Sequence, residues 1–142
     1  MAGSLTAGAV TLTTITDGTY TVTPAALSNG IVKAWVNFDG SGSVSTNQTI
    51  RSSYNVSSVY KNSTGNYTIN FTNALTDTNY AVVGSTAFSG YSGAAAVGIV
   101  SEYTSGSSTY GTKTTTAVQI VSSDNNSDQF LDGYSLNCAI FR

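Results

Sequence analysis

The sequence predicts an all-β fold: one domain over residues 1–142, built as an antiparallel β-sandwich, jelly-roll-like, of about eight to ten strands. Apolar residues alternate with Thr, Ser and Asn along most of the chain, which is the period-two pattern of a half-buried strand. Turn-forming residues separate these runs at intervals of roughly 10–15 residues. Residues that favour helices are scarce, with one Glu and three Lys in the whole chain.

Residues 1–30 are expected to form an N-terminal hairpin or arm. Two short runs here alternate apolar residues with Thr, and Asp17-Gly18 between them is a tight-turn signal. Pro24 ends the second run, because proline cannot donate a hydrogen bond to a β-ladder.

Residues 31–142 are expected to form the body of the domain. From Ile31 to Phe38, one face carries apolar side chains and the other carries Lys33, Trp35 and Asn37. The run from Tyr80 to Phe88 is long and apolar enough for a central strand. The other expected strands follow the alternation at Ile50 to Val56, Tyr67 to Phe71, Ala95 to Ile99, Thr116 to Ile120 and Tyr134 to Ile140.

Charged residues make up only 8% of the chain, with five Lys and Arg against seven Asp and Glu and a net charge of −2. No basic stretch could neutralise phosphates, so we expect no nucleic-acid partner. No apolar run reaches the length of a membrane-spanning segment, so we expect no membrane partner. The first residues show no signal-peptide pattern.

The absence of His excludes Ser-His-Asp and Cys-His catalysis and metal ligation by imidazole. The single cysteine, Cys138, alternates with apolar residues and is expected to be a small buried hydrophobe. The stretch from Asp124 to Asp128 resembles the start of a calcium loop, but Gln129 and Ser135 stand where Gly and an acidic residue are required. We therefore predict no metal and no cofactor.

Four Asp residues lie at or near turns: Asp17, Asp39, Asp77 and Asp132. A glycosidase needs two carboxylates that flank the sugar, whereas turn capping explains each of these residues by itself. No catalytic residue is therefore predicted, and a glycan-processing enzyme is a remote alternative.

Four aromatic residues are candidates for an interface or a recognition surface: Trp35, Tyr91, Tyr103 and Tyr110. Trp35 lies in mid-strand, where a place in the core or at a subunit interface is the plainer interpretation and contact with a sugar or receptor is the alternative. The three tyrosines lie in Gly- and Ser-rich stretches, where tyrosine serves recognition of a protein or glycan as readily as loop packing.

A segment from Lys33 to Gly84 carries a family resemblance. Its characteristic stretches are KAWVNFDG from Lys33, IRSSYNVSS from Ile50, GNYTINFT from Gly65 and NYAVV from Asn79. Together they resemble a structural module of tailed-bacteriophage virion proteins, notably of marine and cyanobacterial phages, found at tail-fibre ends and in short head and tail surface proteins. The segment covers a little over a third of the chain and implies no catalytic residues.

The resemblance implies a virion structural protein, assembled in the host cytoplasm, that is not an enzyme. Because the chain has no long shaft, a capsid decoration or cement protein on the head exterior is the first expectation. A tail-fibre or tail-tip receptor-binding protein that contacts a host glycan is the alternative. The expected partners are the chain itself, as a homotrimer that hides sheet edges, and other virion proteins such as the major capsid protein.

Overall fold

The structure is a computed structural model of the 142-residue chain. It describes residues 15–16, 18–19, 21–23, 30–88, 97–101, 113–123 and 130–142, with the backbone alone at residues 15, 22 and 97–101. The chain divides into two compact units, Met1–Ile31 and Val32–Arg142.

The first unit contains a short hairpin. Strands β1 (Ile15–Thr16) and β2 (Thr21–Val22) pair antiparallel, with Ile15 opposite Val22. Gly18 has a φ of 96°, a conformation that glycine adopts without strain, and its N–H donates to Thr16 Oγ1 at 3.2 Å. The hairpin predicted around Asp17-Gly18 is confirmed.

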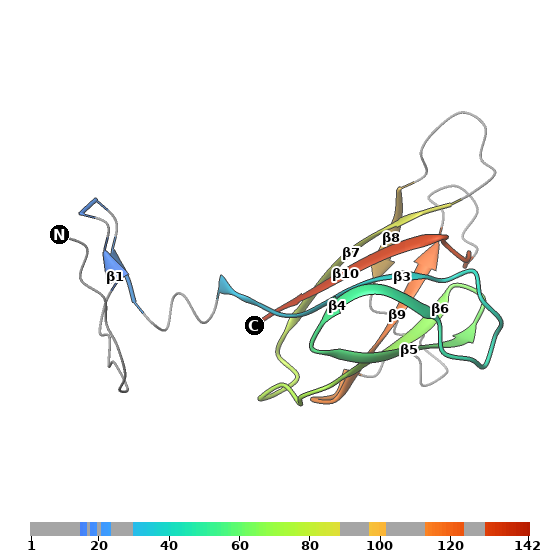
Figure 1. The fold of residues 1–142 in the computed structure, drawn as a ribbon, viewed down its shortest axis with the longest axis horizontal. Coiled ribbons are helices and arrows are strands. Elements are labelled where there is room, and N and C mark those ends of the chain that lie inside the picture. The colour runs from blue at the N-terminus through green and yellow to red at the C-terminus, as the bar shows by residue number, and fades with distance from the viewer. Residues whose placement is uncertain are drawn as a thin grey trace. The chain divides into compact units, whose positions relative to one another are not determined.

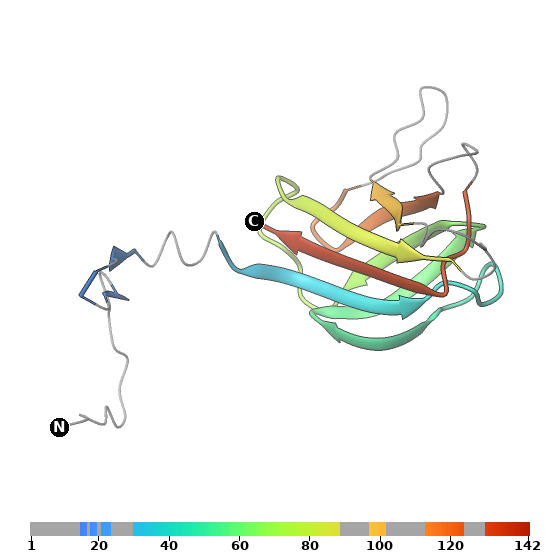
Figure 2. The same ribbon diagram turned by 90° about the horizontal axis from the view of Figure 1, so that it is seen from above.

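The second unit is an antiparallel β-sandwich, as predicted. Its strands are β3 (Val32–Asp39), β4 (Thr49–Tyr54), β5 (Val56–Ser63), β6 (Asn66–Phe71), β7 (Ala81–Ala87), β8 (Val97–Ser101), β9 (Ala117–Ser123) and β10 (Ser135–Phe141). They are hydrogen-bonded in the order β4-β3-β10-β7-β8-β9-β6-β5. This sheet folds over on itself, so that β3, β10 and β7 lie side by side in one layer and β5, β6 and β9 lie in the other (Figures 1 and 2).

The hydrophobic core fills the space between the two layers. On β3 the side chains of Ala34, Val36 and Phe38 are buried, which is the face predicted from the alternation. Phe38 packs edge-to-face on Tyr67 of β6, with ring centroids 5.2 Å apart. Cys138 on β10 is also buried, which confirms the prediction of a small core residue. The other core residues are Val56, Val59, Ile69, Phe71, Leu75, Tyr80, Val118, Ile120, Leu136 and Ile140.

The chain turns a corner at Asn55, where the sequence predicted one continuous run from Ile50 to Val56. Asn55 has a φ of 54°, a left-handed conformation that asparagine tolerates better than most residues. Its side chain donates to Lys33 O at 3.1 Å and accepts from Asn73 N–H at 2.8 Å. These bonds hold the corner, so β4 pairs with β3 in one layer while β5 pairs with β6 in the other.

Candidate functional site

The solvent-facing side of the β4-β3-β10-β7 layer, which we call the outer face, carries a row of apolar side chains. Trp35 on β3 lies opposite Tyr54 on β4 and Ala139 on β10, and Ala139 lies opposite Val83 on β7. Trp35 is 37% exposed, Tyr54 58% and Val83 51%. Paired residues in an antiparallel sheet share a face, so strand register alone assembles this row from four strands.

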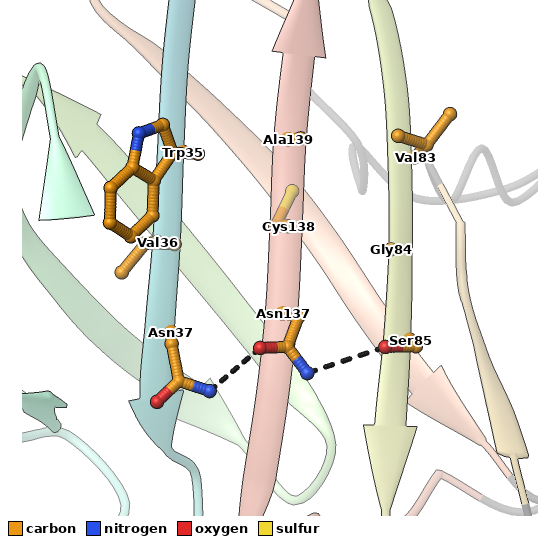
Figure 3. A pocket seen from close by; sticks show the side chains of 9 residues that line it. All are labelled: Trp35, Val36, Asn37, Val83, Gly84, Ser85, Asn137, Cys138 and Ala139. Atoms are coloured by element: carbon orange, nitrogen blue, oxygen red, sulfur yellow. Dashed lines mark hydrogen bonds between the residues drawn. The ribbon is translucent and has the colours of Figure 1, made fainter. Parts of the chain in front are cut away.

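A polar row lies beside the apolar one, two residues along each strand. Asn37, Asn137 and Ser85 are paired in register across β3, β10 and β7, and we call them the amide row. Asn37 Nδ2 donates to Asn137 Oδ1 at 2.7 Å, and Asn137 Nδ2 donates to Ser85 Oγ at 3.3 Å (Figure 3). The hydrogen bonds run in one direction across three strands, and each fixes the orientation of the next side chain.

The two rows border an open hollow of about 460 Å³, which is within the usual size of a small-ligand site. It is lined by Trp35, Val83, Ala139 and the amide row, together with Val36, Gly84 and Cys138 on the same strands (Figure 3). None of the outward-facing side chains that line it carries a charge or titrates near neutral pH. The hollow is therefore suited to binding an uncharged molecule and not to proton transfer.

Sequence reasoning located one of the residues of this hollow. Trp35 was a candidate, and its exposure shows that it does not belong to the core; the interface and recognition interpretations stay predictions. Tyr91, Tyr103 and Tyr110 lie outside the described residues. The amide row was missed. The sequence indicated only that Asn37 shares a face with Trp35. It could not indicate that Asn37 pairs with Asn137, because the two positions are 100 residues apart.

A second polar cluster lies at one end of the sandwich and is partly buried, with the Asp132 side chain 28% exposed. Lys61 of β5 is 2% exposed, and its Nζ donates to Asp132 Oδ2 at 2.6 Å, to Gly42 O at 2.7 Å and to Gly40 O at 3.0 Å. Asp132 Oδ1 accepts from Gly65 N–H at 2.8 Å and lies 2.9 Å from the Tyr67 hydroxyl. We call this cluster the polar lock. It ties the segment after β3, the β5–β6 turn and the segment before β10 to one another.

Burial, followed by the hydrogen bond with Asp132, raises the pKa of the Tyr67 phenol well above its usual range. Tyr67 therefore stays a hydrogen-bond donor at any pH that the fold tolerates. The same site demands glycine at position 40, because a Cβ there would lie 2.5 Å from the Tyr67 hydroxyl oxygen. It also favours glycine at position 65, where φ is 63°.

Two of the Asp residues weighed as catalytic candidates have lowered pKa values. Hydrogen bonds from the Ser41 hydroxyl and N–H lower the pKa of Asp39, with a contribution from Arg51 at 3.1 Å. The guanidinium of Arg142, which donates from Nε to Asp77 Oδ1 at 2.7 Å, lowers the pKa of Asp77 to about 2. A general acid requires a raised pKa, so both residues suit structural ion pairs. Both oxygens of Asp132 are engaged in the polar lock.

The remaining candidates fall elsewhere. Asp17 and the calcium-like stretch 124–128 lie outside the described residues. Within the described ranges, no three Cys, Asp or Glu side chains gather in a way that could hold a metal ion. No helix in those ranges has the length and apolar character needed to cross a membrane.

Comparison of the chain with protein-family models, with curated proteins and with solved structures found no match.

Proposed function

We propose that the chain is a virion structural protein of a tailed bacteriophage, and specifically a decoration or cement protein on the exterior of the head. It acts by binding and not by catalysis, and its partners are further copies of itself, as a homotrimer, and the major capsid protein.

The observation that supports this proposal most is where the phage-like segment lies in the fold. The segment 33–84 runs through β3, β4, β5 and β6 into β7, and these strands belong to both layers of the sandwich. The resemblance therefore concerns the folded body and not a peripheral loop. A module that recurs in different virion proteins has to fold by itself wherever it is placed, and a body with its own core meets that need.

The division into two units is compatible with a display role. The unit Met1–Ile31 precedes a body whose core and polar lock are formed within Val32–Arg142. In the proposed arrangement the first unit contributes to attachment, and the sandwich stays exposed on the particle.

Purified particles of the phage that encodes the chain provide the test. We expect the protein to be present at a constant ratio to the major capsid protein in quantitative gel densitometry, and labelled antibody to decorate heads in electron micrographs. Light scattering of the purified chain should give three times the mass of one chain. Absence of the protein from purified particles would overturn the proposal.

A tail-tip receptor-binding protein is the second candidate, and the hollow on the outer face favours it. An exposed Trp beside oriented amide groups is a recognition surface that a purely structural subunit does not require. The same particles separate the two candidates, because a tail-tip protein would be far less abundant than the capsid protein and antibody would label tails.

A further inference from the structure

We propose that the hollow on the outer face is a carbohydrate site that takes one ring of a neutral glycan, with a pyranose ring on Trp35 and its hydroxyl groups on the amide row. This site belongs to the sandwich itself, so it would serve the protein equally on a head or on a tail.

The shape of the apolar row provides a place for a flat ring. Trp35 lies on one side of Ala139 and Val83 on the other, both side chains point away from Ala139, and its short side chain leaves the space over β10 open (Figure 3). The C–H-bearing face of a pyranose is apolar and packs on an indole, while the sugar's hydroxyls stay at the rim of the ring. Trp35 is already partly exposed, so stacking would bury apolar surface without rearranging the sheet.

The amide row retains hydrogen-bonding capacity of both kinds. Asn37 Nδ2 lies within hydrogen-bond distance of Asn137 Oδ1, Ser135 Oγ and Leu136 O, at 2.7, 3.3 and 3.4 Å, which uses its two hydrogens. Among the described residues, no hydrogen bond engages Asn37 Oδ1, the second N–H of Asn137 or the hydroxyl hydrogen of Ser85. One acceptor and two donors are thus available, and a sugar hydroxyl can both donate and accept.

The distance between the two rows and the uncharged lining of the hollow favour a neutral sugar. Residues two apart on a strand are about 6.4–6.8 Å apart, so a ring on the apolar row would direct hydroxyls toward the amide side chains, which reach back toward it. The side chains that line the hollow are uncharged, and a charged sugar would lose hydration there without gaining a counter-charge. Because the Asn37–Asn137–Ser85 bonds already orient the amides, little side-chain ordering is required on binding.

The chain provides its own reporter, because Trp35 is its single tryptophan. The full-length protein is titrated with neutral oligosaccharides of glucose, galactose, mannose and N-acetylglucosamine, and tryptophan fluorescence and calorimetry are recorded. We expect a saturable fluorescence change with at least one of these sugars and a matching heat of binding. No saturable signal with any of them would overturn the proposal.

Variants then locate the site. We expect Trp35→Ala to abolish the calorimetric signal and Asn137→Ala to weaken binding by about 3–10-fold through loss of one neutral hydrogen bond. Tyr60→Ala is the matched control: Tyr60 on β5 is also 37% exposed but lies in the opposite layer, and its variant should bind normally. A cooperative unfolding transition in each of the three variants would show that all of them fold.

Two other outcomes would overturn the proposal. Sugar binding that persists in both Trp35→Ala and Asn137→Ala would place the site elsewhere. Light scattering that shows a complex of copies, dispersed by Trp35→Ala while the wild type ignores the sugars, would mean that a second protein surface covers the hollow. Neither result depends on head or tail location, so failure here is distinct from failure of the virion proposal.

Discussion

The polar lock and the amide row are both chains of hydrogen bonds that join distant segments. They differ in whether their donors and acceptors are all paired within the protein. In the lock, Lys61 Nζ is buried and has three acceptors, and both oxygens of the partly buried Asp132 are engaged. In the amide row, donors and acceptors are left over on a solvent-facing surface. A closed buried network stabilises a fold, because opening it strands charges in the interior. An open one costs little to expose and is available for a ligand.

Removing the charged group of Lys61 from the polar lock should have the largest effect on the free energy of unfolding. We expect Lys61→Met to lower the free energy of unfolding by about 1.5–3 kcal/mol, because the partly buried Asp132 carboxylate and two carbonyls lose their charged donor. Urea denaturation followed by circular dichroism measures this loss. The double variant Lys61→Met/Asp132→Asn should recover part of it, since no unpaired charge then remains.

Arg51→Met is the matched control for Lys61→Met. Arg51 also pairs with an Asp, Asp39 at 3.1 Å, but both side chains are more than a third exposed to solvent, at 39% and 34%. Exposed pairs of this kind contribute about 0–1 kcal/mol. If the two Met variants were equally destabilised, burial would not be what distinguishes the lock.

The next effect compares one aromatic group in each region. Tyr67→Phe removes a buried hydroxyl that lies 2.9 Å from Asp132, and we expect a loss of about 1–3 kcal/mol. Trp35→Ala removes a larger side chain from the outer face but should cost about 1 kcal/mol or less, because the residue is already partly exposed. Urea unfolding midpoints decide the order. A larger loss for Trp35→Ala would mean that the outer face supports the fold.

These two regions also mark how far the sequence could be interpreted. Alternation identified the buried face of β3, the hairpin at Gly18 and the burial of Cys138, since each depends on local pattern. The burial of Lys61 was not predicted, although Lys61 lies in phase with Val59 in the alternation of β5. What the alternation could not supply was the partner, because Asp132 lies 71 residues away.

The corner at Asn55 was missed for a different reason. Asn55 is a polar residue between Tyr54 and Val56, and a polar residue at that position reads as the outward side of one continuous strand. Its left-handed φ depends on bonds to the backbone of Lys33 and Asn73, which approach it only in the folded chain. Long-range contacts of this kind, and not local propensity, determine where β4 ends and β5 begins.

The ion pair of Asp77 with Arg142 lies at the surface and belongs to neither network, and its contribution to stability can be measured by varying the pH. The hydrogen bonds from Arg142 lower the pKa of Asp77 in the folded chain to about 2, which is below its pKa in the unfolded chain. Its contribution to stability is therefore present above about pH 4 and is lost as the pH falls toward 2. We expect the urea midpoint to fall across this window, and to fall less steeply in Asp77→Asn.

Asp39 has a lowered pKa as well, so some acid sensitivity should survive in the Asp77→Asn variant. Adding Asp39→Asn should flatten the profile further. An unchanged slope in the double variant would show that neither pair contributes to folding in acid.

The smallest expected effect concerns a buried polar group that belongs to neither network. Thr86 on β7 is buried, and its hydroxyl has no hydrogen-bond partner among the described residues. Thr86→Val replaces that hydroxyl with a methyl group of similar shape and should raise the free energy of unfolding by about 1 kcal/mol, since an unsatisfied buried oxygen is removed.

The matched control is Thr114→Val. The Thr114 hydroxyl accepts from Ala117 N–H at 2.9 Å, so the same replacement should lower stability there. A gain at position 86 with a loss at position 114 would show that a threonine hydroxyl stabilises the sandwich only where it is hydrogen-bonded.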